Sequence, residues 1–290
     1  MTTTDQGVPG VAGEDILDVV RRALREDLAH GPDITTDATI PTDAHGVAEL
    51  RARTAGVVAG LPIAAAVFME SSDGRLRCER HREDGTSVAA GEVLMTVTGP
   101  VRDLLTAERT ALNFVTHLSG IATLTRTVVD AIAGTRASVR DSRKTLPGLR
   151  VLQKYAVRCG GGENHRMALG DQALIKDNHI QSAGSLTEAF HAVRAAAPDL
   201  TVEVECDTLD QVEEAITAGA TLILLDNMTT DQLRSAVQLA RRAGGVLLEA
   251  SGRLTPGAAR AVAETGVDYL AVGALTHSAP ALDIGLDLTG

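Results

Sequence analysis

The sequence predicts an α/β protein in which a small α+β domain precedes a parallel βα barrel. From Gly134 onward, short apolar runs alternate with helical patterns, and the repeat recurs about every 20 residues. The apolar runs are nearly continuous, which is typical of strands buried on both faces of a parallel sheet. Hydrophobic residues make up 44% of the 290 residues and charged residues 22%, so the chain can bury a full core.

The first part of the chain predicts helices packed with a small sheet. A helix is expected over residues 14–29, because its apolar residues recur at helical spacing. A second, longer helix is expected over 104–133, and Ser119-Gly120 would kink or break it. Residues 30–41 predict a turn and a loop, and the alternation in VLMTVTG favours antiparallel strands.

The second part of the chain predicts six successive strands, each but the last followed by a helix. The segments that contain them are ASVRDSRK, QALIKDN, TVEVECD, TLILLDN, GVLLEASG and DYLAVGA. An open doubly wound sheet is the alternative to a barrel. However, no G-x-G-x-x-G sequence follows the first strand, and units this regular favour a barrel.

Composition excludes several classes of protein. No apolar run approaches the roughly 20 residues that cross a bilayer, and residues 1–13 are expected to form a mobile tail, not a signal peptide. The net charge of −11 and the 2% aromatic content argue against a nucleic-acid-binding protein. The three cysteines fit neither a disulfide framework nor a four-ligand zinc site, so we expect a cytoplasmic protein; they are Cys78, Cys159 and Cys206.

Positive charge is concentrated in one stretch of the chain. Residues 140–177 contain eight Lys or Arg and four Asp or Glu, a local charge of +4, so the rest of the chain carries −15. Such a stretch is typical of a pocket for a small polyanion. A solvated helix face is the alternative, and Lys154 and Arg158, four residues apart, are expected on a face of that kind.

Each strand of the predicted barrel ends in polar residues or glycine. They are Asp141-Ser142-Arg143-Lys144, Lys176-Asp177-Asn178, Glu203 with Glu205 and Asp207, Asp226-Asn227, Glu249-Ala250-Ser251-Gly252 and Gly273. The carboxyl ends of barrel strands converge on the face that holds the active site. Asp207 and Asp231 are expected to be helix N-caps only. Lys176, Glu205 and Asp226 still belong to apolar runs, and they predict one shared site.

These residue types suit a phosphorylated sugar, a metal ion and a second, multiply anionic substrate. Arginine holds carboxylates and phosphates through planar bidentate contacts. Glu205 and Asp226 on neighbouring strands can hold Mg²⁺ or stabilise a developing cation. The small turns at Ser251-Gly252 and Gly273-Ala274 can bind phosphate through backbone N–H groups.

One long stretch closely resembles the signature sequence of the quinolinate phosphoribosyltransferase family: DSRKTLPGLRVLQKYAVRCGGGENHRMALGDQALIKDNHI. The resemblance covers the chain from Glu14 onward, through EDLAHGPDITT, AERTALNFVTHLSGIAT, VEVECDTLDQ, LILLDNM, LEASGRLT and VDYLAVGALTHSAPALDIGLDL. Ser142 stands where Thr is as frequent in the family, and this departure keeps the hydroxyl group.

The resemblance implies an N-terminal open-faced α/β sandwich domain and an incomplete α/β barrel. The corresponding segments are a tail (1–13), the sandwich (14–115), the barrel (116–275) and a C-terminal segment that returns to the sandwich (276–290). The implied reaction belongs to de novo NAD biosynthesis. It joins quinolinate to 5-phosphoribosyl 1-diphosphate with Mg²⁺, giving nicotinate mononucleotide, diphosphate and CO₂.

The resemblance also implies a role for each matched residue. The quinolinate-binding residues would be Arg109, Ser142, Arg143, His165, Arg166 and Lys176. The residues binding phosphoribosyl diphosphate would be Lys144, Glu205, Asp226, Ser251, Gly252, Arg253, Val272, Gly273, Ala274 and His277. Lys144, Glu205 and Asp226 would be catalytic, and the two acids would bind Mg²⁺, partly through substrate and water. The family forms homodimers, or higher homo-oligomers, in which Arg109 reaches into the partner's barrel.

Two alternatives remain open from the sequence. The first is a related enzyme, either a nicotinate-type phosphoribosyltransferase or the paralogue associated with molybdenum transport. A monocarboxylate pocket should lack some of four cations that are all present here: Arg109, Arg143, Arg166 and Lys176. The second is an inactive paralogue that senses an anionic ligand, which would be expected to have lost residues that are all retained: Lys144, Glu205 and Asp226.

Overall fold

The computed structural model describes residues 8–252 and 254–289, and the chain divides into two compact units. Unit 1 comprises the residues up to Arg126, Thr145–Gly161, and the residues from Leu275 onward. Unit 2 comprises Thr127–Lys144 and Gly162–Ala274. The chain therefore passes from one unit to the other four times.

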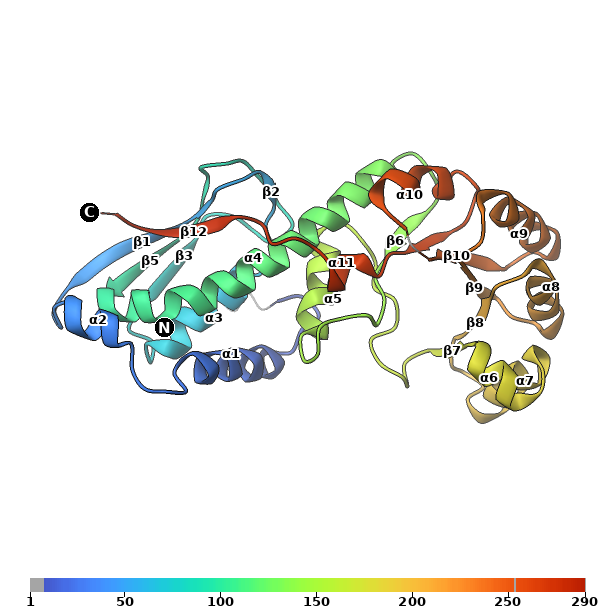
Figure 1. Cartoon of the computed structure of the whole chain (residues 1–290), viewed down its shortest axis with the longest axis horizontal. Coiled ribbons are helices and arrows are strands. Elements are labelled where there is room, and N and C mark those ends of the chain that lie inside the picture. Colours follow the sequence, from blue (N-terminus) through green and yellow to red (C-terminus); the bar gives the residue numbers. More distant parts are fainter. Residues whose placement is uncertain (1–7, 253, 290) are drawn as a thin grey trace. The chain divides into compact units, whose positions relative to one another are not determined.

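Unit 1 is built on a four-stranded antiparallel sheet of order β12-β1-β5-β3, with a separate two-stranded pair β2-β4 (Figure 1). In β1 the buried residues Ala48, Leu50 and Ala52 alternate with less buried ones, which confirms an antiparallel sheet with one covered face. The strands are β1 (His45–Ala52), β2 (Gly56–Val57), β3 (Arg77–Arg80), β4 (Ser87–Val88), β5 (Val93–Pro100) and β12 (Ile284–Thr289).

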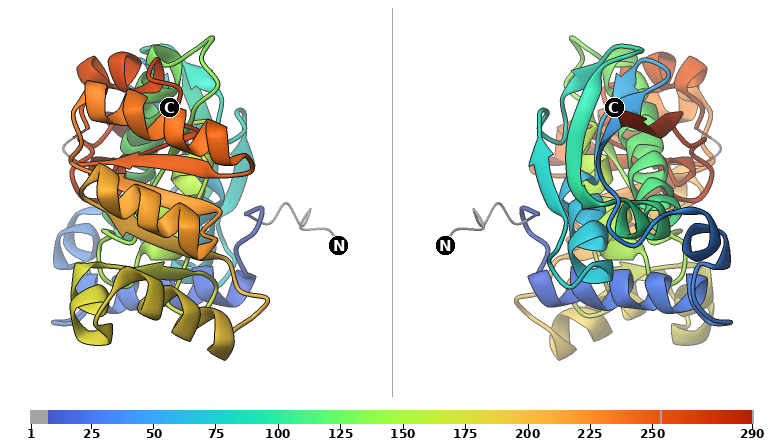
Figure 2. Two further views of the ribbon diagram at one scale, coloured as in Figure 1. Left: turned by 90° about the vertical axis from the view of Figure 1, so that its right-hand side faces the viewer. Right: turned by 90° about the vertical axis from the view of Figure 1, so that its left-hand side faces the viewer.

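The helices of unit 1 agree in part with the sequence-based expectation. The helix expected over 14–29 is α1, which buries Ile16, Val20 and Leu24 at helical spacing. The expected loop over 30–41 was wrong in part, because it contains α2, whose N-terminus is capped by the Asp33 carboxylate. The helices, seen with the sheet in the right view of Figure 2, are α1 (Gly13–Asp27), α2 (Ile34–Thr39), α3 (Leu61–Ser71), α4 (Val101–Ala131), α5 (Arg150–Cys159) and α11 (Ala274–His277).

Helix α4 runs without interruption through Ser119-Gly120, so the expected break is wrong. A Cβ atom on Gly120 would lie 2.1 Å from the carbonyl oxygen of Pro280. The position therefore requires glycine because the backbone of the C-terminal segment packs directly on the helix. Although α4 has 31 residues, neither it nor any other helix in the described part of the chain is apolar enough to cross a membrane.

Two further expectations differ from the structure of unit 1. Residues 1–7 of the expected tail lie outside the described residues, but Val8 is buried and Arg158 Nη2 donates to the carbonyl oxygen of Pro9 at 2.6 Å. The solvated face expected for Lys154 and Arg158 is also wrong, since Lys154 is fully buried. Helix α5 packs within unit 1: Gln153 lies 2.8 Å from the His117 ring and Tyr155 donates to Asp84 at 2.8 Å.

Unit 2 is a six-stranded parallel sheet of order β6-β11-β10-β9-β8-β7, with helices along one side of the strands in Figure 1. All six predicted strands are present. The strands are β6 (Ser138–Arg140), β7 (Ala173–Ile175), β8 (Val202–Cys206), β9 (Leu222–Asp226), β10 (Leu247–Ser251) and β11 (Tyr269–Ala271). The helices are α6 (Asp177–Ala183), α7 (Leu186–Ala196), α8 (Leu209–Ala218), α9 (Thr230–Ala243) and α10 (Pro256–Ala263).

The barrel is incomplete, as expected, because β6 and β7 are not paired with each other. The sheet order follows the chain order around a barrel and is open only between these two strands. The helix that follows β6 in sequence is α5, which belongs to unit 1. On its free edge β6 instead pairs with one returning residue, Glu163, opposite Arg140. The segment between β6 and β7 therefore does not close the barrel, and the loop after Glu163 instead lines the cavity at the strand ends.

The N-termini of α8 and α9 correct two assignments. The N-caps are Thr208 and Thr229, and not Asp207 and Asp231. Each threonine hydroxyl accepts from the backbone N–H three residues later, and the glutamine at that position reaches back to the threonine N–H. Asp207 and Asp231 thus carry no capping role.

Candidate active site

The carboxyl ends of the strands of unit 2 surround a cavity of about 350 Å³. All of its lining residues belong to unit 2; they are Asp141, Ser142, Arg143, Lys144, His165, Arg166, Leu174, Lys176, Glu205, Leu224, Asp226, Glu249, Ser251 and Ala271. The strand ends predicted to share one site therefore do so, as the barrel fold requires.

Most of the predicted site residues line this cavity, and each is placed by a strand or by the loop after it. Ser142 to Lys144 follow β6, and His165 with Arg166 follow the bridge between Glu163 and β6. Lys176 follows β7, where it begins α6. The remaining three lie at the ends of consecutive strands: Glu205, Asp226 and Ser251.

Several predicted residues lie outside the cavity lining. Gly252 follows β10 with φ of 136°, and a Cβ there would lie 2.8 Å from Asn227 Oδ1, so the turn requires glycine. Val272 and Gly273 follow β11, and Ala274 begins α11. Arg109 on α4 and His277 at the end of α11 belong to unit 1, so their roles remain predictions. Arg253 lies outside the described residues.

The arginines that line the cavity are in an environment that favours binding of an anion. Arg143 Nε is buried and has no hydrogen-bond partner in the described part of the chain. The pKa of Arg166 is lowered, first by burial and then by the positive charge of Arg143. Two guanidinium groups close enough to repel each other favour a bound carboxylate or phosphate, which accepts from planar N–H donors.

The acidic part of the cavity lies on the neighbouring strands. Lys176 Nζ lies 2.5 Å from Glu205 Oε2, across the parallel pair β7-β8. Asp226 Oδ2 accepts from Asn227 Nδ2 at 2.6 Å, and Asn227 has the positive φ of 53° that asparagine tolerates. Glu205 and Asp226 thus project from adjacent strand ends, beside the cations that line the same cavity.

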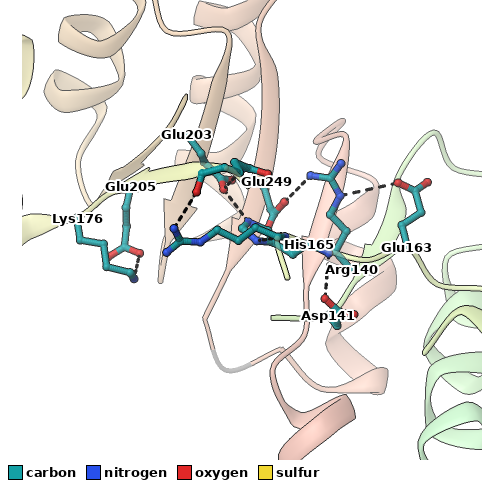
Figure 3. A network of polar contacts seen from close by, with 10 residues as sticks. Arg140, Asp141, Glu163, His165, Lys176, Glu203, Glu205 and Glu249 are labelled. Atoms are coloured by element: carbon teal, nitrogen blue, oxygen red, sulfur yellow. Dashed lines mark hydrogen bonds and ion pairs between the residues drawn. The ribbon is translucent and has the colours of Figure 1, made fainter. Parts of the chain in front are cut away.

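A network of buried charges lies beneath the cavity (Figure 3). Glu203 and Glu249, from β8 and β10, are both fully buried. His165 Nε2 lies 2.6 Å from Glu203 Oε2 and 3.6 Å from Glu249 Oε1. Arg140 Nη1 donates to Glu249 Oε2 at 2.9 Å, and its guanidinium lies over the Tyr269 ring. This network fixes the His165 ring at the cavity wall.

Asp141 fixes the backbone of the same segment. It is fully buried, and its carboxylate accepts from the His165 N–H at 2.9 Å and from Asn164 Nδ2 at 2.6 Å. Sequence reasoning noted Asp141, Glu203 and Glu249 as strand ends but gave them no role in the site. The sequence does indicate that these two acids are buried, because Glu203 stands between two valines and Glu249 between a leucine and an alanine in apolar strands. Only inward-facing acids with partners fit such positions.

The residues present fit a magnesium ion at Glu205 and Asp226. Both offer carboxylate oxygens at the cavity, which are the ligands Mg²⁺ prefers together with water and substrate phosphate. His165, Glu203 and Glu249 also have ligand atoms within 4.8 Å of one another. However, their close contact is already a hydrogen bond, and a histidine with two fully buried carboxylates leaves no water-filled coordination positions for Mg²⁺.

Comparisons with known proteins identify the family of the chain. Residues 33–119 match the N-terminal domain of quinolinate phosphoribosyl transferase, and residues 121–287 match its C-terminal domain. The nicotinate-nucleotide pyrophosphorylase [carboxylating] of Mycobacterium leprae is 55% identical over 274 residues, covering 93% of this chain and 96% of the relative. A probable enzyme of the same name from Synechocystis is 43% identical over 267 residues, covering 91% of this chain and 90% of the relative.

Solved structures agree as well. The nicotinate-nucleotide pyrophosphorylase from Francisella tularensis superposes with a TM-score of 0.92 at 39% identity, covering 99% of this chain and all of that chain. Both domain matches and the fold thus agree with the family that the signature stretch predicts. The chain belongs to the quinolinate phosphoribosyltransferase family.

Proposed function

We propose that this protein transfers the phosphoribosyl group of 5-phosphoribosyl 1-diphosphate to quinolinate with loss of CO₂, forming nicotinate mononucleotide and diphosphate for de novo NAD biosynthesis. The observation that supports this reaction most directly is that cationic and acidic residues line one and the same cavity. Arg143 and Arg166 suit a dicarboxylate, while Glu205 and Asp226 suit a cationic ribose centre. Family membership and the named relatives support the same reaction.

The cationic residues bind and orient the pyridine substrate. Arg143 and Arg166 hold its carboxylates by bidentate contacts, with Ser142 and His165 beside them. Lys176 is released from Glu205 to complete the pocket. Orientation of the ring nitrogen toward the anomeric carbon makes bond formation effectively intramolecular, which lowers the barrier substantially.

The acidic residues act on the phosphoribosyl donor. As diphosphate leaves, positive charge builds on the ribose, and the fixed carboxylates of Glu205 and Asp226 stabilise it electrostatically. Lys144 faces the departing diphosphate, and the turns after Ser251 and Val272 hold the 5′-phosphate with His277. When bound, Mg²⁺ would be held by Glu205 and Asp226, and it would supply positive charge that offsets the negative charge of the diphosphate.

Decarboxylation follows from the chemistry of the product. Once the ring nitrogen is joined to ribose it is quaternary, and it withdraws electrons from the adjacent carbon that carries the carboxylate. The C–CO₂ bond then breaks with its electron pair left on that carbon, which takes up a proton. Exclusion of water by the bound substrates would favour this step, because a carboxylate that is less hydrated loses CO₂ more easily.

The active assembly that we propose is a homodimer with shared sites, in which Arg109 completes the quinolinate pocket of the partner subunit. We also propose that the protein acts in the cytoplasm. The three cysteines are free thiols, and burial raises the pKa of each to about 12. Thiols of this kind need no oxidising compartment.

A direct assay tests the proposed function. The purified protein is given 5-phosphoribosyl 1-diphosphate, Mg²⁺ and quinolinate labelled at the 2-carboxylate. Release of labelled CO₂ in equal amount to nicotinate mononucleotide is expected, with no product when nicotinate replaces quinolinate. Asp226→Asn serves as the matched inactive variant. Product from nicotinate but not from quinolinate would refute the proposal in favour of a nicotinate-type enzyme.

A further inference from the structure

Glu249 is a fully buried carboxylate that lies in the floor of the cavity. Its charged and titratable neighbours come from each structural element around it. Arg140 from β6 donates to its Oε2, Glu203 lies on β8, and His165 comes from the loop that follows the Glu163 bridge. Tyr269 on β11, its register partner, lies under Arg140, and on β9 the register partner is the apolar Leu224.

The hydrogen bonds show which ring nitrogen of His165 carries a proton. The backbone N–H of Arg166 donates to His165 Nδ1 at 2.8 Å, so Nδ1 is an acceptor and holds no proton. Nε2 then carries the proton and donates to Glu203 Oε2, which also accepts from Gln172 Nε2 at 3.1 Å. This short hydrogen bond joins the His165 ring to the Glu203 carboxylate.

The network places two fully buried carboxylates, Glu203 and Glu249, against two partners that can carry positive charge, Arg140 and His165. One oxygen of each glutamate, Glu203 Oε1 and Glu249 Oε1, is buried without a hydrogen-bond partner in the described part of the chain. The charge of Arg166 lies near Glu203 and partly compensates it. A dicarboxylate bound in the cavity would draw that same guanidinium to itself. It would also add negative charge above the floor, where buried unpaired charge is costly.

We propose that Glu249 takes up a proton when the dicarboxylate substrate binds, so that the cavity floor carries one negative charge less beneath a dianionic ligand. The inference rests on the proposed function for the identity of that ligand. Burial, followed by the negative charge of Glu203, raises the pKa of Glu249 to about 7, against the opposing effects of His165 and Arg140. Further negative charge above it raises that pKa again, so protons are taken up on binding near neutral pH.

Calorimetry measures this proton directly. Quinolinate is titrated into the wild-type protein at pH 7 in buffers of low and high ionisation enthalpy, and the difference in observed heat gives the number of protons taken up. A substantial fraction of one proton is expected. Affinity should fall between pH 6 and pH 8, by up to about tenfold per pH unit above pH 7.

Two variants locate the proton. In Glu249→Gln, uptake should fall to near zero while quinolinate still binds, because the amide keeps the hydrogen bond to Arg140. Glu163→Gln is the matched control, since Glu163 lies near Arg140 Nε at 3.8 Å but is half exposed, and its uptake should equal that of the wild type. Infrared difference spectra of the wild type should gain a carboxylic acid C=O band on binding, and this measurement needs no variant.

The outcomes are separable. Quinolinate binding without proton uptake, equal uptake in Glu249→Gln, or a wild-type difference spectrum without the acid band overturns this inference and leaves the proposed function standing. Absence of quinolinate binding at millimolar concentration, in the presence and absence of the phosphoribosyl donor, overturns both.

Discussion

Lys176 and Glu205 form an ion pair across β7 and β8, with Nζ 2.5 Å from Oε2, although the two residues are assigned to different substrates. The cation assigned to the dicarboxylate and the carboxylate assigned to the ribose are thus paired with each other in the structure. The pair is partly solvated, because the Lys176 side chain is 44% exposed. Binding of the two substrates must therefore break this ion pair, which requires little free energy.

Replacement of Glu205 by Gln should separate the two roles of this pair. Turnover is expected to fall at least about 100-fold, because the ribose cation loses a fixed charge. Quinolinate affinity should change by no more than about fivefold, since partly exposed pairs contribute roughly 0–1 kcal/mol. Steady-state kinetics and quinolinate titration measure the two effects. Glu213→Gln, on the exposed face of α8, is the control. A large loss of quinolinate affinity would contradict the assignment of Glu205 to the ribose.

Removal of Arg166 should damage quinolinate recognition selectively. Arg166→Ala leaves a buried substrate carboxylate unpaired and is expected to cost about 2–5 kcal/mol in quinolinate affinity or turnover. Binding of the phosphoribosyl donor should be nearly unchanged. Arg166→Lys should not restore activity, because the planar donor geometry is lost. The exposed Arg194 on α7 provides the control Arg194→Ala. Equal loss for both substrates would show that Arg166 is misassigned.

Chelation should abolish activity reversibly. Glu205 and Asp226 are oxygen donors, so excess chelator is expected to reduce turnover to background, and added Mg²⁺ or Mn²⁺ to restore it. Initial rates at controlled free-metal concentration provide the measurement. Unchanged activity in excess chelator would rule out a metal requirement. The Asp226→Asn variant should need a higher Mg²⁺ concentration for whatever activity it retains.

Mixing two inactive variants tests the shared site. If Arg109 acts in the partner's barrel, a dimer of one Arg109→Ala and one Glu205→Ala subunit contains one site with both defects and one intact site. Half of randomly reassorted dimers are mixed, so about a quarter of wild-type activity should return. Each variant alone should be nearly inactive.

The control for this experiment is proof of exchange between subunits, for example by mass spectrometry of differently tagged chains. If exchange is complete and no activity returns, Arg109 acts within its own chain, because every site then retains one defect.

Gly120→Ala should destabilise unit 1, although alanine is the better helix former. The added Cβ would lie 2.1 Å from the Pro280 carbonyl oxygen, so the C-terminal segment must shift. Overpacking of this kind costs about 1–3 kcal/mol, which outweighs the gain of up to about 1 kcal/mol in helix propensity. Urea denaturation measures the change. Gly13→Ala in α1 is the control, since a Cβ there meets nothing within 4 Å.

The barrel was predictable because its signals are local. Each strand is an apolar run, and the residue that ends it is a site residue by the geometry of parallel strands, as Lys176 and Asp226 show. Helices α2 and α3 were not predicted for a different reason. The first is a single capped turn, and the second is apolar on all sides, so neither has amphipathic periodicity.

Residues whose environment depends on distant parts of the chain were the ones missed. Lys154 is fully buried because α5 leaves the barrel and packs in unit 1, which no local pattern indicates. Gly120 suggested a helix break, whereas its real constraint comes from Pro280, 160 residues later. The position of the His165 ring likewise depends on Glu203 and Glu249, which come from two other strands.

The pairing of β1 with β12 has a consequence for how the protein is made. Leu50 lies opposite Leu286, so β1 acquires one of its two neighbours in the unit 1 sheet only from a strand that follows the whole barrel in sequence. During translation the edge of β1 stays open while the entire barrel emerges from the ribosome. Contacts between residues so far apart in sequence form slowly, and an unpaired strand edge favours aggregation with other chains. Deletion of β12 (Ile284–Thr289) should therefore reduce the soluble yield far more than the loss of a peripheral strand suggests.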